Sequence, residues 1–122
     1  MSKGTILIVD DSPTEQHVLK VILEKAGYHV EAALDGQTGI ARAKELKPNL
    51  VLMDVVMPVL NGFQATRKLR EDKDTATIPV IMVTTKDQDT DKAWAERQGA
   101  QGYLVKPVAP PELLKKVSEL IK

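Results

Sequence analysis

Five polar residues stand directly after short apolar runs in this 122-residue sequence, and their types suit one kind of chemistry. Asp10 and Asp11 follow one run, and Asp54, Thr84 and Lys106 each end or follow another. Three neighbouring carboxylates repel one another unless a cation joins them. Mg²⁺ prefers such oxygen ligands and often binds through one or two carboxylates and a phosphate. An aspartate nucleophile, Mg²⁺, a lysine and a hydroxyl together indicate phosphoryl transfer, which depends on positioning and on stabilising negative charge.

The apolar runs predict the strands that would position these residues. Residues 5–9, 50–53, 80–83 and 103–105 form short apolar runs, typical of strands buried on both faces of a parallel sheet. Residues 29–33 are more polar and predict a weaker strand at an edge of the sheet.

Helical patterns separate the predicted strands. Ser12 is a good N-cap, Pro13 suits a first helical position, Glu15 completes a capping box, and Gly27 ends the first helix. Apolar residues recur at helical spacing within it, at Val18, Leu19, Ile22, Leu23 and Ala26. The other helices are expected from a cap at Asp35 to about Leu46, after a loop through Asn61-Gly62 over residues that include Phe63, Thr66 and Leu69, from about Asp87 to near Gly99, and from Pro110 or Pro111 through Ile121.

Five strands alternating with five helices predict an α/β fold, in which a parallel sheet has helices on both faces and right-handed crossovers. We see no linker or second domain and expect one domain over residues 1–122. The carboxyl ends of parallel strands share one edge, where sites form at the switch in strand order. The five polar residues should therefore gather at that edge.

Composition narrows the function classes. Seventeen basic and seventeen acidic residues give a formal net charge of zero, which does not favour nucleic acid as a partner. The absence of cysteine excludes disulfides and thiolate zinc sites. No apolar run approaches the roughly 20 residues that cross a bilayer, and the N-terminal residues do not resemble a signal peptide. We therefore expect a cytoplasmic protein without membrane insertion.

Several motifs in order resemble those of CheY-like response-regulator receiver domains. They are Asp10-Asp11-Ser12, the run from Asp54 to Pro58 with Asn61-Gly62, Val83-Thr84, and the run from Tyr103 to Pro107. The resemblance covers essentially the whole chain. It implies a flavodoxin-like (βα)5 fold with strand order 2-1-3-4-5, in which the first and third strands are neighbours.

The same resemblance implies roles for individual residues. Asp54 would accept a phosphoryl group from a histidine kinase and become a 4-aspartylphosphate. Mg²⁺ would be bound by Asp10, by Asp11 more directly, by Asp54 and by the backbone carbonyl of Val56. The protein would then be no enzyme in the ordinary sense, because it would catalyse only its own phosphorylation and hydrolysis.

Two further implied roles concern the switch. Thr84 and Lys106 would contact the phosphoryl oxygens, and Tyr103 would swing inward as Thr84 moves. The Lys106-Pro107 bond would be cis. The altered surface of the fourth helix, fifth strand and fifth helix would then bind a downstream protein, with the chain a monomer or weak dimer. We expect Trp94, near that surface, to serve packing rather than partner contact.

Shorter segments resemble a subgroup, the single-domain PilH-like regulators of the type IV pilus, which act in a chemotaxis-like pathway controlling twitching motility. These segments are 11–15, 61–67, 84–88 and 98–100.

Three positions depart from common receiver patterns or tune the family's chemistry. Thr85 follows Thr84, where many receivers have a smaller residue, and it could narrow access to Asp54. Val56 and Lys86 stand two residues after Asp54 and Thr84, at positions that flank the site in the family. We expect these two residues to set the phosphoryl lifetime.

Three alternatives remain open at this point. One is a phosphate sink without an output partner. Another is a Mg²⁺-dependent phosphatase of the haloacid dehalogenase type, although Ser12 stands where such enzymes have their second aspartate. The third is a flavin-binding module, although Asp10-Asp11 would repel its phosphate.

Overall fold

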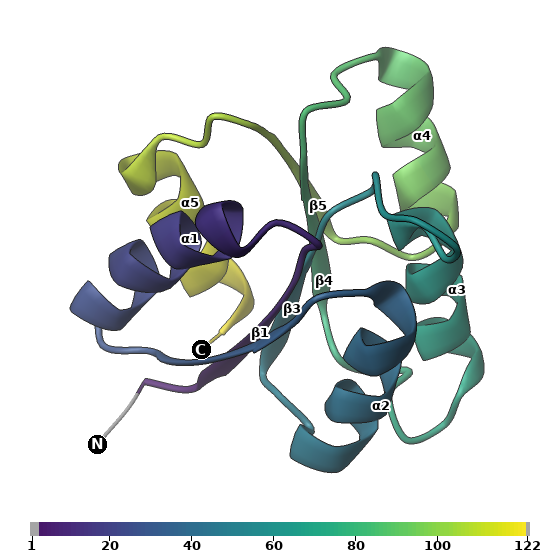
Figure 1. The fold of residues 1–122 in the computed structure, drawn as a ribbon, viewed down its shortest axis with the longest axis horizontal. Helices are drawn as coiled ribbons and strands as arrows, with labels where there is room; N and C mark the ends of the chain where they lie inside the picture. The colour runs from purple at the N-terminus through teal and green to yellow at the C-terminus, as the bar shows by residue number, and fades with distance from the viewer. Residues whose placement is uncertain (1–2, 122) are drawn as a thin grey trace.

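The computed structural model describes residues 3–121, which form a five-stranded parallel sheet between two layers of helices (Figure 1). The strands are β1 (Thr5–Val9), β2 (His29–Ala33), β3 (Leu50–Met53), β4 (Val80–Thr84) and β5 (Gly102–Val105). The helices are α1 (Pro13–Lys25), α2 (Gly36–Leu46), α3 (Gly62–Glu71), α4 (Asp89–Arg97) and α5 (Pro110–Leu120). The strand order β2-β1-β3-β4-β5 confirms the predicted fold and the edge position of β2.

The strands are apolar throughout because both faces of the sheet are covered. Helices α1 and α5 lie on one face and α2, α3 and α4 on the other (Figure 1). Successive strand side chains point to opposite faces, so Ile6 and Ile8 join the α1/α5 core, whereas Leu7 and Val9 join the α2–α4 core.

The strand register brings the predicted site residues together. Val9 is the partner of Met53, so the residues that follow them, Asp10 and Asp54, lie side by side at the end of the sheet. Thr84 is the partner of Val105, which places Lys106 beside the end of β4. The backbone N–H of Lys106 donates to the carbonyl of Thr84 at 2.8 Å. The topology thus positions residues that are far apart in the sequence.

Helix α3 begins close to the backbone of Asp54 because its first residue is glycine. A Cβ atom on Gly62 would lie 2.2 Å from the carbonyl oxygen of Asp54, which no side chain could tolerate. Asn61 caps the helix by accepting from the N–H of Gln64, and the Gln64 side chain accepts from the N–H of Asn61. This reciprocal capping box fixes the loop that follows Asp54.

The capping box predicted at α1 is wrong, although the N-cap itself is confirmed. The Ser12 hydroxyl accepts from the N–H of Glu15 at 3.3 Å. The N–H of Ser12, however, donates to Asp10 Oδ1 at 2.9 Å and is therefore not available to Glu15. The Glu15 carboxylate lies 3.7 Å from the Lys106 ammonium instead.

The remaining helices follow the predictions closely. Asp35 caps α2 by accepting from the N–H of Thr38 at 2.7 Å, as expected. Helix α4 begins at Asp89, two residues later than Asp87. Trp94 on α4 is 46% exposed, so much of its ring faces solvent. Within residues 3–121, no helix combines the length and hydropathy that crossing a membrane requires.

Candidate functional site

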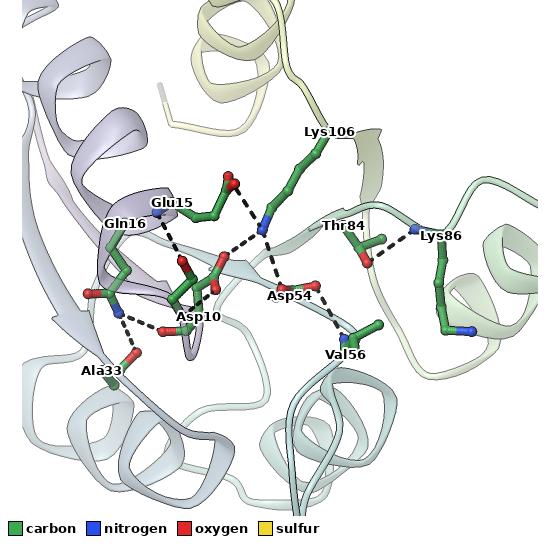
Figure 2. Close-up of polar contacts among 10 residues, drawn as sticks. Asp10, Glu15, Gln16, Ala33, Asp54, Val56, Thr84, Lys86 and Lys106 are labelled. Carbon is green, nitrogen blue, oxygen red and sulfur yellow. Dashed lines mark hydrogen bonds and ion pairs between the residues drawn. The ribbon is translucent and has the colours of Figure 1, made fainter.

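Asp10 is a buried acid whose every polar group has a partner. It is 2% exposed at the end of β1. Its Oδ1 accepts from the N–H of Ser12 at 2.9 Å, and its Oδ2 accepts from the ammonium of Lys106 at 2.7 Å (Figure 2). A buried carboxylate is stable only when it is paired and hydrogen-bonded, so these contacts explain how the fold tolerates it.

Asp54 is the second buried acid, at 8% exposure. Its Oδ1 accepts from the N–H of Val56 at 3.2 Å, and its Oδ2 accepts from Lys106 at 3.3 Å (Figure 2). The contact from Val56 holds the carboxylate against the β3–α3 loop. That loop also brings the backbone of Val56 next to the acid, although the role of its carbonyl as a metal ligand stays a prediction.

Asp11 is exposed and completes a trio of carboxylates. Asp10, Asp11 and Asp54 each offer one oxygen, and these oxygens all lie within 4.8 Å of one another. In octahedral Mg²⁺ coordination, oxygens on opposite sides of the ion are about 4 Å apart. The spacing and the all-oxygen donor set therefore fit such an ion after a small closure. The convergence predicted from the strand ends is present.

Lys106 supplies the positive charge in this acidic site. Burial of its ammonium favours the neutral form, but the hydrogen bond to Asp10 and the charges of Asp54, Asp10 and Glu15 outweigh it. The pKa of Lys106 is consequently raised above its ordinary value, so the side chain stays charged at neutral pH. A fixed charge between two acids can balance added negative charge at the same place.

Thr84 and Tyr103 both contact the β4–α4 loop. The buried Thr84 hydroxyl accepts from the N–H of Lys86 at 3.4 Å, and no hydrogen bond joins it to Asp54 within the described part of the chain. The Tyr103 hydroxyl donates to the carbonyl of Lys86 at 2.8 Å. Both side chains therefore contact the backbone of the same residue.

The phenol of Tyr103 is partly buried and faces several acids. Burial, followed by the charges of Asp91, Asp54 and Asp87, raises the pKa of Tyr103 to about 12. The hydroxyl is therefore protonated at neutral pH and able to donate its hydrogen bond. The Lys106-Pro107 peptide is cis, as predicted.

Two residues of the site were missed by sequence reasoning. Glu15 contacts Lys106. Gln16 donates from its side-chain amide to the carbonyls of Asp10 and Ala33, at 2.9 and 2.7 Å (Figure 2). Polar residues in a first helical turn are common, so their types carry no signal. Their contacts become visible only in the folded structure, where the first turn of α1 lies next to the ends of the strands.

The fold, together with the acidic edge formed by Asp10, Asp11 and Asp54 at the carboxyl ends of the strands, defines a receiver domain. A model of the response regulator receiver domain family matches residues 6–118, and the chain belongs to this family. That membership agrees with the order of the five strands and sets aside the phosphatase and flavin-module interpretations.

Individual members of the family resemble the chain over nearly its whole length. The chain is 58% identical over 116 residues to protein PilH of Pseudomonas aeruginosa, covering 95% of this chain and 96% of PilH. The crystal structure of chemotaxis protein CheY4 of Vibrio cholerae, obtained at low pH, superposes with a TM-score of 0.90 at 34% identity, covering 96% of this chain and 98% of CheY4. The chain spans about half the length of several other relatives, which are transcriptional regulators.

A third relative holds a metal ion in the corresponding kind of domain. The receiver domain of sensor histidine kinase PA1611 from Pseudomonas aeruginosa superposes with a TM-score of 0.89 at 31% identity, covering 97% of each chain. Its structure has a magnesium ion coordinated in the active-site cleft. The resemblance to PilH-like receivers that the motifs indicated is confirmed.

Proposed function

We propose that Asp54 accepts a phosphoryl group from the phosphohistidine of a histidine kinase in a Mg²⁺-dependent reaction, and that the phosphorylated chain signals by protein contact. The observation that carries this proposal is the position of the Lys106 ammonium, which bridges Asp10 and Asp54 while Asp11 completes the carboxylate trio. Asp10, Asp11, Asp54 and the Val56 carbonyl would hold the metal. When bound, Mg²⁺ supplies charge that neutralises phosphoryl oxygens.

The chain's own residues position the reaction. A carboxylate oxygen of Asp54 forms the new bond to phosphorus as the phosphorus–nitrogen bond to the kinase histidine breaks, and the electron pair of that bond returns to the imidazole. The N–H of Val56 orients the carboxylate. Lys106, already 3.3 Å from Asp54, balances charge on the transferred group. Transfer to a carboxylate held in this way is mostly a matter of positioning and electrostatics.

The signal would pass through Thr84 and Tyr103 to the surface of α4, β5 and α5. The phosphoryl oxygens would draw the Thr84 hydroxyl away from the N–H of Lys86, and Tyr103 would follow on the carbonyl of the same residue. A charge-assisted hydrogen bond contributes roughly 1.5–3 kcal/mol. Shifting a two-state conformational equilibrium from 1:99 to 99:1 requires a difference of about 5.5 kcal/mol in binding free energy between the two states. Thr84 would therefore supply only part of the switch, and Lys106, Mg²⁺ or a partner the rest.

The identity with PilH supports a place in the control of type IV pilus twitching motility. In this proposal residues 1–122 form one receiver domain that acts in the cytoplasm as a monomer or weak dimer. The alternative of a phosphate sink uses the same chemistry without an output partner. A phosphorylation-dependent change at Trp94, the single tryptophan, would support an output surface, and its absence would favour the sink.

The proposal is tested by treating the protein with acetyl phosphate and Mg²⁺ and measuring its intact mass. The wild type should gain one phosphoryl group, and Asp54→Asn should gain none. Asp74→Asn, an exposed acid in the α3–β4 loop, is the matched control and should be modified like the wild type. Modification of Asp54→Asn, or equal modification with EDTA in place of Mg²⁺, would contradict the proposal.

A further inference from the structure

Gln16 joins the ends of the two strands that lead into the acidic site. Its side-chain nitrogen has two hydrogens, and it lies 2.9 Å from the carbonyl oxygen of Asp10 and 2.7 Å from that of Ala33 (Figure 2). The N–H of Asp10 also donates to the carbonyl of Ala33, at 3.1 Å. One amide thus closes a small ring of hydrogen bonds between β1, β2 and the first turn of α1.

The carbonyl of Asp10 depends on this contact. Asp10 is buried, and within residues 3–121 Gln16 is the hydrogen-bond donor to its carbonyl. The carbonyl of Ala33 differs, because it also accepts from the N–H of Asp10. Loss of the Gln16 amide would therefore leave the Asp10 carbonyl buried and unpaired, a state that folded proteins avoid by moving the backbone or admitting water.

The orientation of that carbonyl determines where Asp11 lies. The peptide bond is planar, so the oxygen of Asp10 and the N–H and Cα of Asp11 lie in one plane. A donor that fixes the oxygen fixes the plane, and with it the direction in which the chain enters Asp11. Asp11 is exposed, and among the described residues its carboxylate has no hydrogen bond of the kind that holds Asp10 and Asp54, so its position rests on the backbone.

We infer that Gln16 is a positioning residue that sets the Asp10-Asp11 peptide, and so holds the carboxylate of Asp11 ready for a divalent cation. This inference rests on the proposed function, since it concerns the same metal site. Within residues 3–121, the Gln16 amide donates to backbone carbonyls and makes no hydrogen bond to an acidic side chain, so it acts through the backbone. Loss of residues that orient metal ligands typically lowers metal affinity about 10- to 100-fold. Because Gln16 acts through a peptide, we expect the lower end, about tenfold.

The test compares the Mg²⁺ affinity of Gln16 variants with that of matched control variants. Gln16→Met keeps the length of the side chain and removes both donors, and Gln16→Asn keeps the amide but is too short to reach both carbonyls. Gln37→Met makes the same chemical change on α2, where the exposed side chain has no hydrogen bond among the described residues. Leu19→Val trims the buried face of α1 and controls for general loosening of that helix.

Isothermal titration with Mg²⁺ should show about tenfold weaker binding for Gln16→Met, a smaller loss for Gln16→Asn and none for the two controls. In acetyl phosphate reactions, the Mg²⁺ concentration for half-maximal rate should rise, while the rate at saturating Mg²⁺ stays near that of the wild type. Wild-type affinity in both Gln16 variants, or an equal loss in Leu19→Val, would overturn the inference alone. A wild-type chain that binds no Mg²⁺ would overturn the proposed function as well.

Discussion

The ammonium of Lys106 lies 2.7 Å from Asp10 Oδ2, although the two residues are 96 positions apart in the sequence. The contact places a permanent positive charge beside the carboxylates that would bind a dication. Lys106 therefore stabilises the acidic edge when the metal is absent and opposes the metal electrostatically when it arrives. The two effects can be separated by replacing this one side chain.

Lys106→Met should destabilise the metal-free protein and tighten Mg²⁺ binding. Removing one partner of a buried ion pair leaves the other charge uncompensated, and here we expect a loss of about 2 to 4 kcal/mol in the free energy of unfolding. Mg²⁺ should restore much of that loss, because it no longer competes with the ammonium. Urea unfolding with EDTA and with saturating Mg²⁺ measures both effects.

The control for this variant is Lys44→Met, which removes an exposed lysine paired with Asp72 at 2.8 Å. Exposed ion pairs contribute little, so this change should leave both the stability and the Mg²⁺ response nearly unaltered. Weaker Mg²⁺ binding by Lys106→Met than by the wild type would show that the lysine assists the metal rather than competing with it.

The contribution of Lys106 to stability should depend on pH only under alkaline conditions. Despite the cost of burial, its ion pairs raise the pKa of Lys106 above 10.5, so the folded state holds the proton more tightly than the unfolded state. Its stabilisation is then fully present below about pH 10.5 and is lost as the pH rises through the folded-state pKa.

This dependence can be measured from the gap in unfolding free energy between the wild type and Lys106→Met in EDTA. The gap should stay constant from neutral pH to about pH 10 and shrink above that. A gap that already closes between neutral pH and pH 9 would mean that the ammonium is not held by Asp10 and Asp54 in solution.

Much of this site could be predicted because strand ends are readable in the sequence. Apolar runs identified four of the strands and a more polar run identified β2, and the polar residues after the four apolar runs marked the shared edge. What could not be predicted were contacts made by side chains of α1. Glu15 has the residue type and spacing of a capping box, yet the N–H of Ser12 is already bonded to Asp10. That competition arises only when the turn between β1 and α1 has folded.

The hydroxyl of Thr84 should matter for the response and not for phosphorylation itself. Thr84→Ala should gain a phosphoryl group as the wild type does, because the Thr84 hydroxyl is bonded to the N–H of Lys86 and makes no hydrogen bond to Asp54. The phosphorylation-dependent change at the surface of α4, β5 and α5 should be weak, because Thr84→Ala removes one hydrogen bond to the phosphoryl group, worth roughly 1.5–3 kcal/mol. The indole NMR signal of Trp94, followed with acetyl phosphate and Mg²⁺, reports the response. The exposed Thr77→Ala, in the α3–β4 loop, is the control, and a full Trp94 response in Thr84→Ala would refute the coupling.

Glu15 should slow phosphorylation by small anionic donors. Its carboxylate lies 3.7 Å from Lys106 and is half-exposed at the mouth of the site, where it repels an approaching phosphate and offsets the lysine charge. Glu15→Gln should raise the rate with acetyl phosphate about threefold at low salt, and the gain should fall as salt screens the charge. Glu24→Gln, near the far end of α1, makes the same change away from the site. Equal rates for these two variants would exclude a local effect of Glu15.

The phosphoryl lifetime should be long, because neither residue that flanks the site offers a group to orient water. The Val56 side chain is 52% exposed beside Asp54 and has no polar atom. The Lys86 ammonium extends away from Asp54 (Figure 2) and lies 3.9 Å from Asp91. Hydrolysis of the acyl phosphate needs a water aligned with the phosphorus, and a suitably placed polar side chain accelerates such steps.

Val56→Asn should therefore shorten the lifetime, by about three- to tenfold if its amide positions a water without acting as a base. Lys86→Glu should also change the lifetime, since it replaces a cation held by Asp91 with an acid that Asp91 repels. The control is Val59→Asn in the same loop, where the side chain is fully exposed and the positive φ of 67° suits asparagine. After acetyl phosphate is removed, intact mass follows the loss of the phosphoryl group. If Val56→Asn and Lys86→Glu decay at the rate of Val59→Asn, the lifetime is set by the buried residues of the site and not by its rim.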